Sequence, residues 1–195
     1  MRRVYACSLE SQERKADSRA AARNDPTQGL SPTYEQAHVG LDLLTLVSLY
    51  IRKDSDMKLL SIAIPCYNSE KYMRKCIDSL LVGGEDVEIL IIDDGSTKDR
   101  TAEIADEYEA QFPTIVRAIH KENGGHGSAV NTGIANAKGL YFKVVDSDDW
   151  VKQDAYFKIL DTLRELAGGG QALDMLISNY VYEKEGERRK KVIQY

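Results

Sequence analysis

Cysteine is scarce in this chain, and the few cysteines form no recognisable site. There are three in 195 residues, Cys7, Cys66 and Cys76. An odd number with irregular spacing argues against a disulfide framework and matches no spacing typical of metal ligands. The cysteine content therefore favours a reducing compartment, and we expect a cytoplasmic protein.

Long hydrophobic runs are also missing. No stretch approaches the ~18 apolar residues of a membrane-spanning helix, and the basic start of the chain is not followed by the apolar core of a secretory signal. The longest apolar segment, residues 41–51, is interrupted by Asp42, Thr45 and Ser48. It predicts an amphipathic helix, through which the chain could lie at the inner face of the membrane or contact a protein partner.

A surplus of basic residues is lacking as well. The chain has 26 Lys and Arg against 31 Asp and Glu, which gives a net charge of −5. Because no basic face is implied, nucleic acid is not the expected partner. The phosphate-binding pattern GxxxxGK[ST] is absent, which excludes a P-loop. A hydrophobic content of 43% and a charged content of 29% are typical of a soluble globular protein.

The first 56 residues differ in character from the rest. Residues 11–31 are polar, rich in Ala and Arg, and without a core pattern, whereas residues 33–52 have the spacing of one helix. We therefore expect a partly disordered N-terminal extension over 1–56, made of an arm and a helix. Met57 precedes a clean strand pattern, so residues 57–195 are expected to form the compact domain.

Strands and helices alternate from Met57 onward. Apolar runs predict strands over 59–64, 87–92, 115–119, 141–145 and 173–182, and the first of these is expected to end at Pro65. Apolar residues at helical spacing predict helices over 70–82, 99–112 and 153–167, with another from the glycine-rich loop at 123–127 through 138. This alternation predicts an α/β fold with a mainly parallel sheet and helices on both faces.

The strand predicted over 141–145 reads as buried and leads directly into three carboxylates. Asp146, Asp148 and Asp149 fill three of four successive positions, with Ser147 between them. Charges this dense cannot sit unpaired in a core, and a hard divalent cation prefers carboxylate oxygens. Taken alone, the segment could equally be an acidic turn without a metal, because Asp and Ser favour turns.

Polar clusters follow three of the predicted strands, at residues 65–70, 93–97 and 146–149. Helix capping or turn formation could explain each one alone. The carboxyl ends of parallel strands, however, lie along one edge of a sheet, so the clusters are expected to converge on one crevice. A nucleotide diphosphate bridged by Mg²⁺ or Mn²⁺ suits such a crevice. Tyr67 offers an aromatic face for a base, and Asn68 and Asp94 can accept hydrogen bonds from the base or ribose.

A dinucleotide-binding fingerprint is the competing interpretation of the glycine-rich loop. Gly125, Gly127 and Val130 follow a predicted strand, and Asp146 lies 21 residues beyond Gly125. Val130, however, occupies the position where a helix packs closely on a strand and a small residue is required. The loop also follows the third strand of the domain, whereas the fingerprint usually follows the first.

Taken together, four motifs resemble the family 2 glycosyltransferases of GT-A fold. The resemblance covers about residues 58–182 and rests on SIAIPCYNSE (61–70), IIDDGSTKDRT (91–101), NGGHGSAVNTG (123–133) and VDSDDW (145–150). Each motif is weak by itself, but four in this order and at this spacing are specific. The resemblance implies transfer of a sugar from a nucleotide-sugar donor, typically a UDP-sugar, to an acceptor hydroxyl with inversion.

The resemblance also implies roles for single residues. Asp94 would hydrogen-bond the base, and Asp93 would shape its turn. The segment 146–148 would be the family's DxD motif, in which Asp148 binds the Mn²⁺ or Mg²⁺ that bridges the diphosphate and Asp146 lies near the ribose and the metal. A general base would deprotonate the acceptor. The implied substrate-binding set is Pro65, Tyr67, Asn68, Glu70, Asp93, Asp94, Gly125 and Asp146.

The sequence departs from the family pattern in two places. Val130 stands where family members often carry Arg, and His126 or Lys121 could supply the missing positive contact. The family's base and acceptor-binding elements lie well beyond the DxD strand, whereas this sequence stops at Tyr195. The late acids Glu183, Glu185 and Glu187 lie in a charged tail typical of an exposed segment.

The catalytic base therefore stays unassigned, and the chain is expected to be the donor-binding half of an enzyme whose acceptor is a carbohydrate, lipid or protein. The alternative is a non-catalytic module that binds a nucleotide sugar or a partner.

Overall fold

The computed structural model describes residues 2–5, 57–169, 174–183 and 191–194. The helix expected over 33–52 and the arm expected before it lie outside the described residues. Residues 2–5 form a strand, β1 (Arg2–Tyr5), which the sequence patterns did not indicate. Contacts group it in one compact unit with the chain from Ser55 onward.

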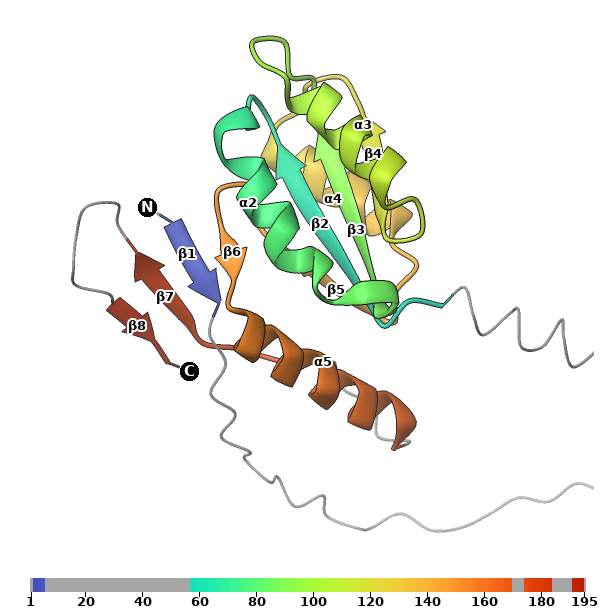
Figure 1. Cartoon of the computed structure of the whole chain (residues 1–195), viewed down its shortest axis with the longest axis vertical. Coiled ribbons are helices and arrows are strands. Elements are labelled where there is room, and N and C mark those ends of the chain that lie inside the picture. Colours follow the sequence, from blue (N-terminus) through green and yellow to red (C-terminus); the bar gives the residue numbers. More distant parts are fainter. Residues whose placement is uncertain (1, 6–56, 170–173, 184–190, 195) are drawn as a thin grey trace, which may run out of the picture. The chain divides into compact units, whose positions relative to one another are not determined.

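A four-stranded parallel sheet forms the centre of the fold, in the order β4-β3-β2-β5 (Figure 1). Its strands are β2 (Leu60–Cys66), β3 (Val87–Asp93), β4 (Val116–His120) and β5 (Tyr141–Val144). Every residue of β2 and β3 is buried, as expected of central strands covered on both faces. The two strands pair over seven residues, from Leu60 opposite Val87 to Cys66 opposite Asp93. The sheet confirms the predicted α/β class.

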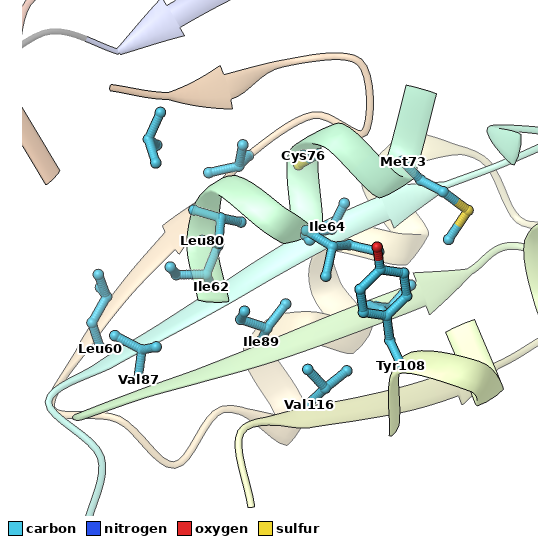
Figure 2. Close-up of a cluster of buried hydrophobic side chains, with 14 of the residues drawn as sticks. Leu60, Ile62, Ile64, Met73, Cys76, Leu80, Val87, Ile89, Tyr108 and Val116 are labelled. Carbon is cyan, nitrogen blue, oxygen red and sulfur yellow. The ribbon is translucent and has the colours of Figure 1, made fainter. Parts of the chain in front are cut away.

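Helices cover both faces of this sheet, as predicted. They are α2 (Glu70–Leu81), α3 (Thr101–Gln111) and α4 (His126–Asn136). Side chains alternate along β3, so that Ile89 and Ile91 join the larger core, which α2 and α3 cover. Leu90 and Ile92 face the other way and pack with Ala129 of α4. Figure 2 shows Met73, Cys76 and Leu80 of α2 and Tyr108 of α3 in the larger core, together with Ile62, Ile64 and Ile89 of the sheet.

The prediction that residues 141–145 form a buried strand is only partly right. Val145 is fully buried, but β5 ends at Val144, and Phe142 on it is 37% exposed. The reason is position, because β5 is the last strand in the sheet order and, among the described strands, pairs with β2 alone. Its apolar residues reflect one covered face, not two.

Pro65 lies inside β2 and does not end it, because Cys66 still pairs with Asp93. Successive residues of a strand direct their backbone groups to alternate neighbours. The Ala63 carbonyl accepts the Val145 N–H at 3.0 Å, and the Cys66 carbonyl accepts the Asp94 N–H at 2.9 Å, which places Pro65 on the β5 side. Having no N–H, Pro65 cannot continue the ladder to β5. The chain after Val145 therefore leaves the sheet at this level.

A second sheet has the order β6-β1-β7-β8, with β6 (Trp150–Val151), β7 (Tyr180–Glu183) and β8 (Lys191–Ile193). β1 pairs parallel with β6 and antiparallel with β7. The strand predicted over 173–182 is therefore wrong in extent, since only its end is strand and that end pairs outside the parallel sheet. α5 (Gln153–Gly168) matches the helix predicted over 153–167. Among the described residues, no helix is both long and apolar enough to cross a membrane.

Two of the three cysteines lie in the core. Cys66 at the end of β2 is 1% exposed and Cys76 on α2 is 0% exposed, and both are free thiols. Burial, with a smaller effect from nearby Asp93 and Asp99, raises the pKa of the Cys66 thiol. Burial likewise raises the pKa of Cys76. Neither thiol is therefore an activated nucleophile.

We expect Gly133→Ala to destabilise the fold, because α4 packs closely against β2 there. A Cβ at Gly133 would lie 2.6 Å from the Cβ of Ala63, so the helix would have to move off the sheet. Thermal unfolding should show a loss of about 1–3 kcal/mol, typical of overpacking. Gly127→Ala in the same helix is the matched control, because a Cβ there meets nothing within 4 Å. A loss no larger than the control would contradict the close approach.

Candidate functional site at the carboxyl ends of the strands

Four polar segments follow the four strands of the parallel sheet, and hydrogen bonds join them. We call them the first loop (67–69, after β2), the second loop (94–100, after β3), the glycine-rich loop (121–125, after β4) and the acidic turn (146–149, after β5). In a parallel sheet the segments that follow the strands share one edge. The predicted convergence of the polar clusters can therefore be followed contact by contact.

Asn68 joins the first loop to the second. Its φ of 50° places it in the left-handed region, which Asn tolerates better than most residues. Its N–H donates to Ser96 Oγ at 2.9 Å. Its side-chain Oδ1 accepts the N–H groups of Thr97 at 3.3 Å and Lys98 at 3.1 Å. The Asn68 side chain thus links two loops that are 30 residues apart in the sequence.

Asp94 joins the second loop to the glycine-rich loop. It is 3% exposed, and its carboxylate accepts hydrogen bonds from Lys121 Nζ, the Gly124 N–H at 3.0 Å and the Gly125 N–H at 2.7 Å. Burial acts to raise the pKa of Asp94, but Lys121 and the two glycine N–H groups outweigh it and lower the pKa. Gly125 has a φ of 84°, a conformation for which glycine is suited. Asp94 is therefore an ionised anchor of the glycine-rich loop.

Asp93 is equally buried and closes its own turn. Its Oδ1 accepts the Ser96 N–H at 3.0 Å, and its Oδ2 contacts His120 Nδ1 at 3.1 Å. The other ring nitrogen of His120 contacts Asp106 Oδ1 on α3 at 3.0 Å. The histidine at the end of β4 therefore lies between two carboxylates, an arrangement that the sequence did not suggest because the three residues are 13 or more positions apart.

We expect His120 to make stability depend on pH. Only the imidazolium can donate at both nitrogens. Burial acts to lower the pKa of His120, but Asp106 and Asp93 outweigh it and raise the pKa above 6.5. The stabilisation is therefore full below the unfolded pKa and is lost as the pH rises through the folded pKa. Urea unfolding should show a larger loss for His120→Gln near pH 5.5 than near pH 8.5. Equal losses would contradict this reasoning.

The acidic turn is joined to both of its neighbours. Asp146 Oδ1 contacts His126 Nε2, the first residue of α4, at 3.0 Å. The Ser147 hydroxyl contacts the Ser69 hydroxyl of the first loop at 2.9 Å. The Asp149 N–H donates to the Asp146 carbonyl at 2.9 Å and closes the turn. These contacts complete a circuit that runs through the four segments and returns to the first loop.

The carboxylates of the acidic turn differ in exposure. Asp149 is 2% exposed, whereas the Asp146 side chain is 39% exposed and Asp148 is partly exposed. Lys143 of β5 lies nearby, and burial lowers its pKa while Asp149 and Asp146 act to raise it. Among the residues that the structure describes, no group of three His, Cys, Asp or Glu side chains could hold a metal ion. A cation at Asp146 and Asp148 would therefore take its further ligands from water or from a bound molecule.

The remaining predicted site residues lie in β2, on the first loop and at the start of α2. Tyr67 is 50% exposed, with its ring available to a ligand. The Glu70 N–H donates to Asp99 Oδ2 at 3.0 Å, and its carboxylate accepts the Arg100 N–H at 3.0 Å. Pro65 is buried in β2. Glu70 thus joins the first and second loops and is not a free acid.

Comparison with known proteins gives a consistent result along most of the domain. The family model described as "Glycosyl transferase family 2" matches residues 61–174. The chain is 39% identical over 132 residues to the "Uncharacterized glycosyltransferase EpsJ" of Bacillus subtilis, covering 67% of this chain and 36% of that protein. It is also 39% identical over 132 residues to the "Glycosyltransferase GlyG" of Streptococcus pneumoniae, covering 67% of this chain and 42% of that protein. The chain thus spans less than half the length of either relative.

Similarity to a solved structure was also found. S. aureus TarS 1–349 in complex with UDP-GlcNAc is 27% identical, with a TM-score of 0.49, covering 56% of this chain and 32% of that one.

The packing of α4 bears on the dinucleotide-binding fingerprint, which requires a small residue at the position of Val130. The close approach of α4 to the sheet occurs instead at Gly133, three residues further along the helix.

Proposed function

The chain belongs to glycosyl transferase family 2. On that premise we propose that its four joined loops bind a nucleotide-sugar donor, a UDP-sugar, and that the sugar is transferred to an acceptor hydroxyl. The observation that carries this proposal is the circuit of hydrogen bonds that places the half-exposed Asp146 beside the loops holding Tyr67 and Asp94. A donor with a diphosphate fits such a site because its oxygens and the carboxylates of Asp146 and Asp148 can share one hard cation.

The base and ribose would lie on the side of the first and second loops. The exposed Tyr67 ring offers a stacking face, with Asn68 and Glu70 following it in the chain and the buried Pro65 preceding it in β2. A carboxylate has about four acceptor positions, and Asp94 uses three of them on Lys121, Gly124 and Gly125. One position on Oδ2 is left for a ring N–H of the base. Asp94 would thus support the ligand mainly through the glycine-rich loop, and Asp93 would do so by shaping its turn.

The diphosphate would lie at the acidic turn. Asp148 and Asp146 supply the hard oxygen ligands that Mg²⁺ or Mn²⁺ prefers, and diphosphate oxygens would complete the set. When bound there, the cation neutralises charge on the leaving diphosphate. His126, the first residue of α4 after the glycine-rich loop, contacts Asp146, so the two segments that would flank the diphosphate are joined to each other.

Transfer would proceed by direct displacement with inversion. The acceptor oxygen would attack the anomeric carbon from the face opposite the diphosphate while a general base removes its proton. The chain's own contribution is then to hold the nucleobase, ribose and diphosphate of the donor so that the anomeric carbon faces the acceptor. We propose a carbohydrate, lipid or protein hydroxyl as the acceptor, and we assign no residue as the base.

Titration calorimetry of the whole chain with UDP and UDP-sugars, with and without Mn²⁺, tests the donor site. Binding that strengthens with Mn²⁺ is the expected result, and GDP and NAD serve as comparison ligands. Absence of UDP binding would overturn the proposal, and preferential NAD binding would revive the dinucleotide interpretation. Release of UDP from a UDP-sugar in the presence of mixed acceptors then tests transfer. Binding without release would favour a donor-binding module over a complete transferase.

A further inference from the structure

We infer that the hydroxyl pair Ser69–Ser147 sets the separation between the base side and the metal side of the donor site, so that both serines are positioning residues. The inference rests on the proposed function, because it concerns how two parts of one donor molecule are held. It adds a role for Ser147, which lies between the two proposed metal ligands and whose side chain is not itself a metal ligand in the proposal.

Ser69 is fixed on the base side by contacts of its own. It is 7% exposed, and its Oγ accepts the Tyr67 N–H at 3.1 Å. Its N–H donates to Thr101 Oγ1 at 2.7 Å, and that hydroxyl donates to Asp99 Oδ1 at 2.7 Å. The backbone that carries the Tyr67 ring is therefore held by the same hydroxyl that contacts Ser147 at 2.9 Å.

Ser147 lies between the two proposed metal ligands, Asp146 and Asp148. The sheet cannot position this turn directly, because Pro65 ends the pairing between β2 and β5 at Val145. Side-chain contacts join it to the neighbouring loops instead. The contact between Asp146 and His126 engages a carboxylate that a cation would share, whereas the contact between Ser147 and Ser69 uses no carboxylate. The serine contact can therefore persist when a metal is bound.

A nucleoside diphosphate contacts both the base side and the metal side, so its binding depends on the distance between them. A nucleoside contacts the base side alone. Preorganisation of two contact points strengthens binding of the ligand that spans them and leaves the smaller ligand unaffected. Loss of the Ser69–Ser147 contact should thus weaken UDP with Mn²⁺ selectively, relative to uridine. A general loss of stability would weaken both ligands together.

The test compares wild type, Ser147→Ala, Ser147→Thr, Ser69→Ala and the double alanine variant in the full chain. Calorimetry measures UDP with Mn²⁺, and uridine is measured separately. We expect Ser147→Ala to weaken UDP with Mn²⁺ by about fivefold, the factor for one hydrogen bond, with uridine unchanged. Ser147→Thr should restore binding because it keeps the hydroxyl. Ser147→Ala should have no further effect in the Ser69→Ala background, since the contact is already lost there.

Several results would overturn the inference. Equal weakening of UDP and uridine, additive effects of the two alanine changes, or an unchanged Ser147→Ala variant in a chain that binds UDP would each do so and leave the proposed function standing. A wild-type chain that does not bind UDP would overturn the proposed function. Hydrogen exchange of the ligand-free chain tests the contact itself, because exchange of the Asp149 N–H should become faster in Ser147→Ala. Unchanged exchange would show that the hydroxyl pair does not hold the turn.

Discussion

Replacing Asp148 with alanine should abolish the part of UDP binding that depends on Mn²⁺. Asp148 is partly exposed in the acidic turn after β5, and one other carboxylate of that turn, Asp146, is also partly exposed. Mutating a residue that hydrogen-bonds to a metal ligand commonly lowers metal affinity by about 10–100-fold. Loss of the ligand itself should lower it by at least roughly that factor. Calorimetry with and without Mn²⁺ measures the effect as the ratio of the two dissociation constants, which should fall to one.

The matched control for this variant is Asp154→Ala, which removes an exposed carboxylate from the first turn of α5. It changes the net charge by the same amount and should leave the ratio unaltered. Asp148→Asn keeps the shape of the side chain and removes only its charge, so it should resemble Asp148→Ala. If Mn²⁺ still strengthened UDP binding to Asp148→Ala as in the wild type, the assignment of Asp148 would be wrong.

The largest loss of stability should follow from Asp94→Asn. The Asp94 side chain is 4% exposed and the side chain of its partner Lys121 is 20% exposed. The amide would remove the charge that Lys121 faces and direct an NH₂ group toward other donors. Breaking a buried pair on one side costs about 3–5 kcal/mol, which corresponds to a fall in Tm of roughly 6–20 °C for a domain of this size. The glycine-rich loop should also lose its anchor, so UDP binding should weaken.

The pH dependence of this variant follows from the lowered pKa of Asp94. A carboxyl group whose folded pKa lies below its unfolded pKa stabilises the fold above the unfolded value of about 3.9. That stabilisation is lost as the pH falls toward the folded pKa. The difference in unfolding free energy between wild type and Asp94→Asn should therefore be full near pH 7 and should shrink below about pH 4. Adding Lys121→Met should recover part of the loss, and a fall in Tm below about 2 °C for Asp94→Asn would contradict the anchoring role.

Local patterns were enough to predict the elements of the parallel sheet. β2 and β3 are continuous apolar runs because both of their faces are covered, and α2 and α5 show helical spacing because one face of each is buried. β1 and β7 were missed or misplaced because their pairing joins residues nearly 180 positions apart. Four residues at the start of a chain have no periodicity from which such a partner could be found.

The convergence of the polar loops was predictable from the sequence, but the contacts between them were not. The acidic run after β5 and the turn after β3 placed the polar loops correctly, because a parallel sheet orders the ends of its strands. The contact between Ser69 and Ser147 spans 78 residues, and the link formed by Asn68 depends on a positive φ. Neither has a local signature. The three internal bonds of Asp94 likewise could not be read from a turn sequence that Asp commonly occupies.

The two buried thiols, Cys66 and Cys76, allow local unfolding near the site to be measured by their rate of alkylation. Cys76 lies on α2 with its Sγ 3.6 Å from the carbonyl of Asp146, and Cys66 ends β2 next to the first loop. A maleimide reagent can reach neither thiol in the closed core, so in a Cys7→Ser background its rate of reaction would report how often these positions become exposed. If a nucleotide rigidifies the loops, alkylation of Cys76 should become slower. Occupancy of the site could then be followed by mass spectrometry without any introduced label.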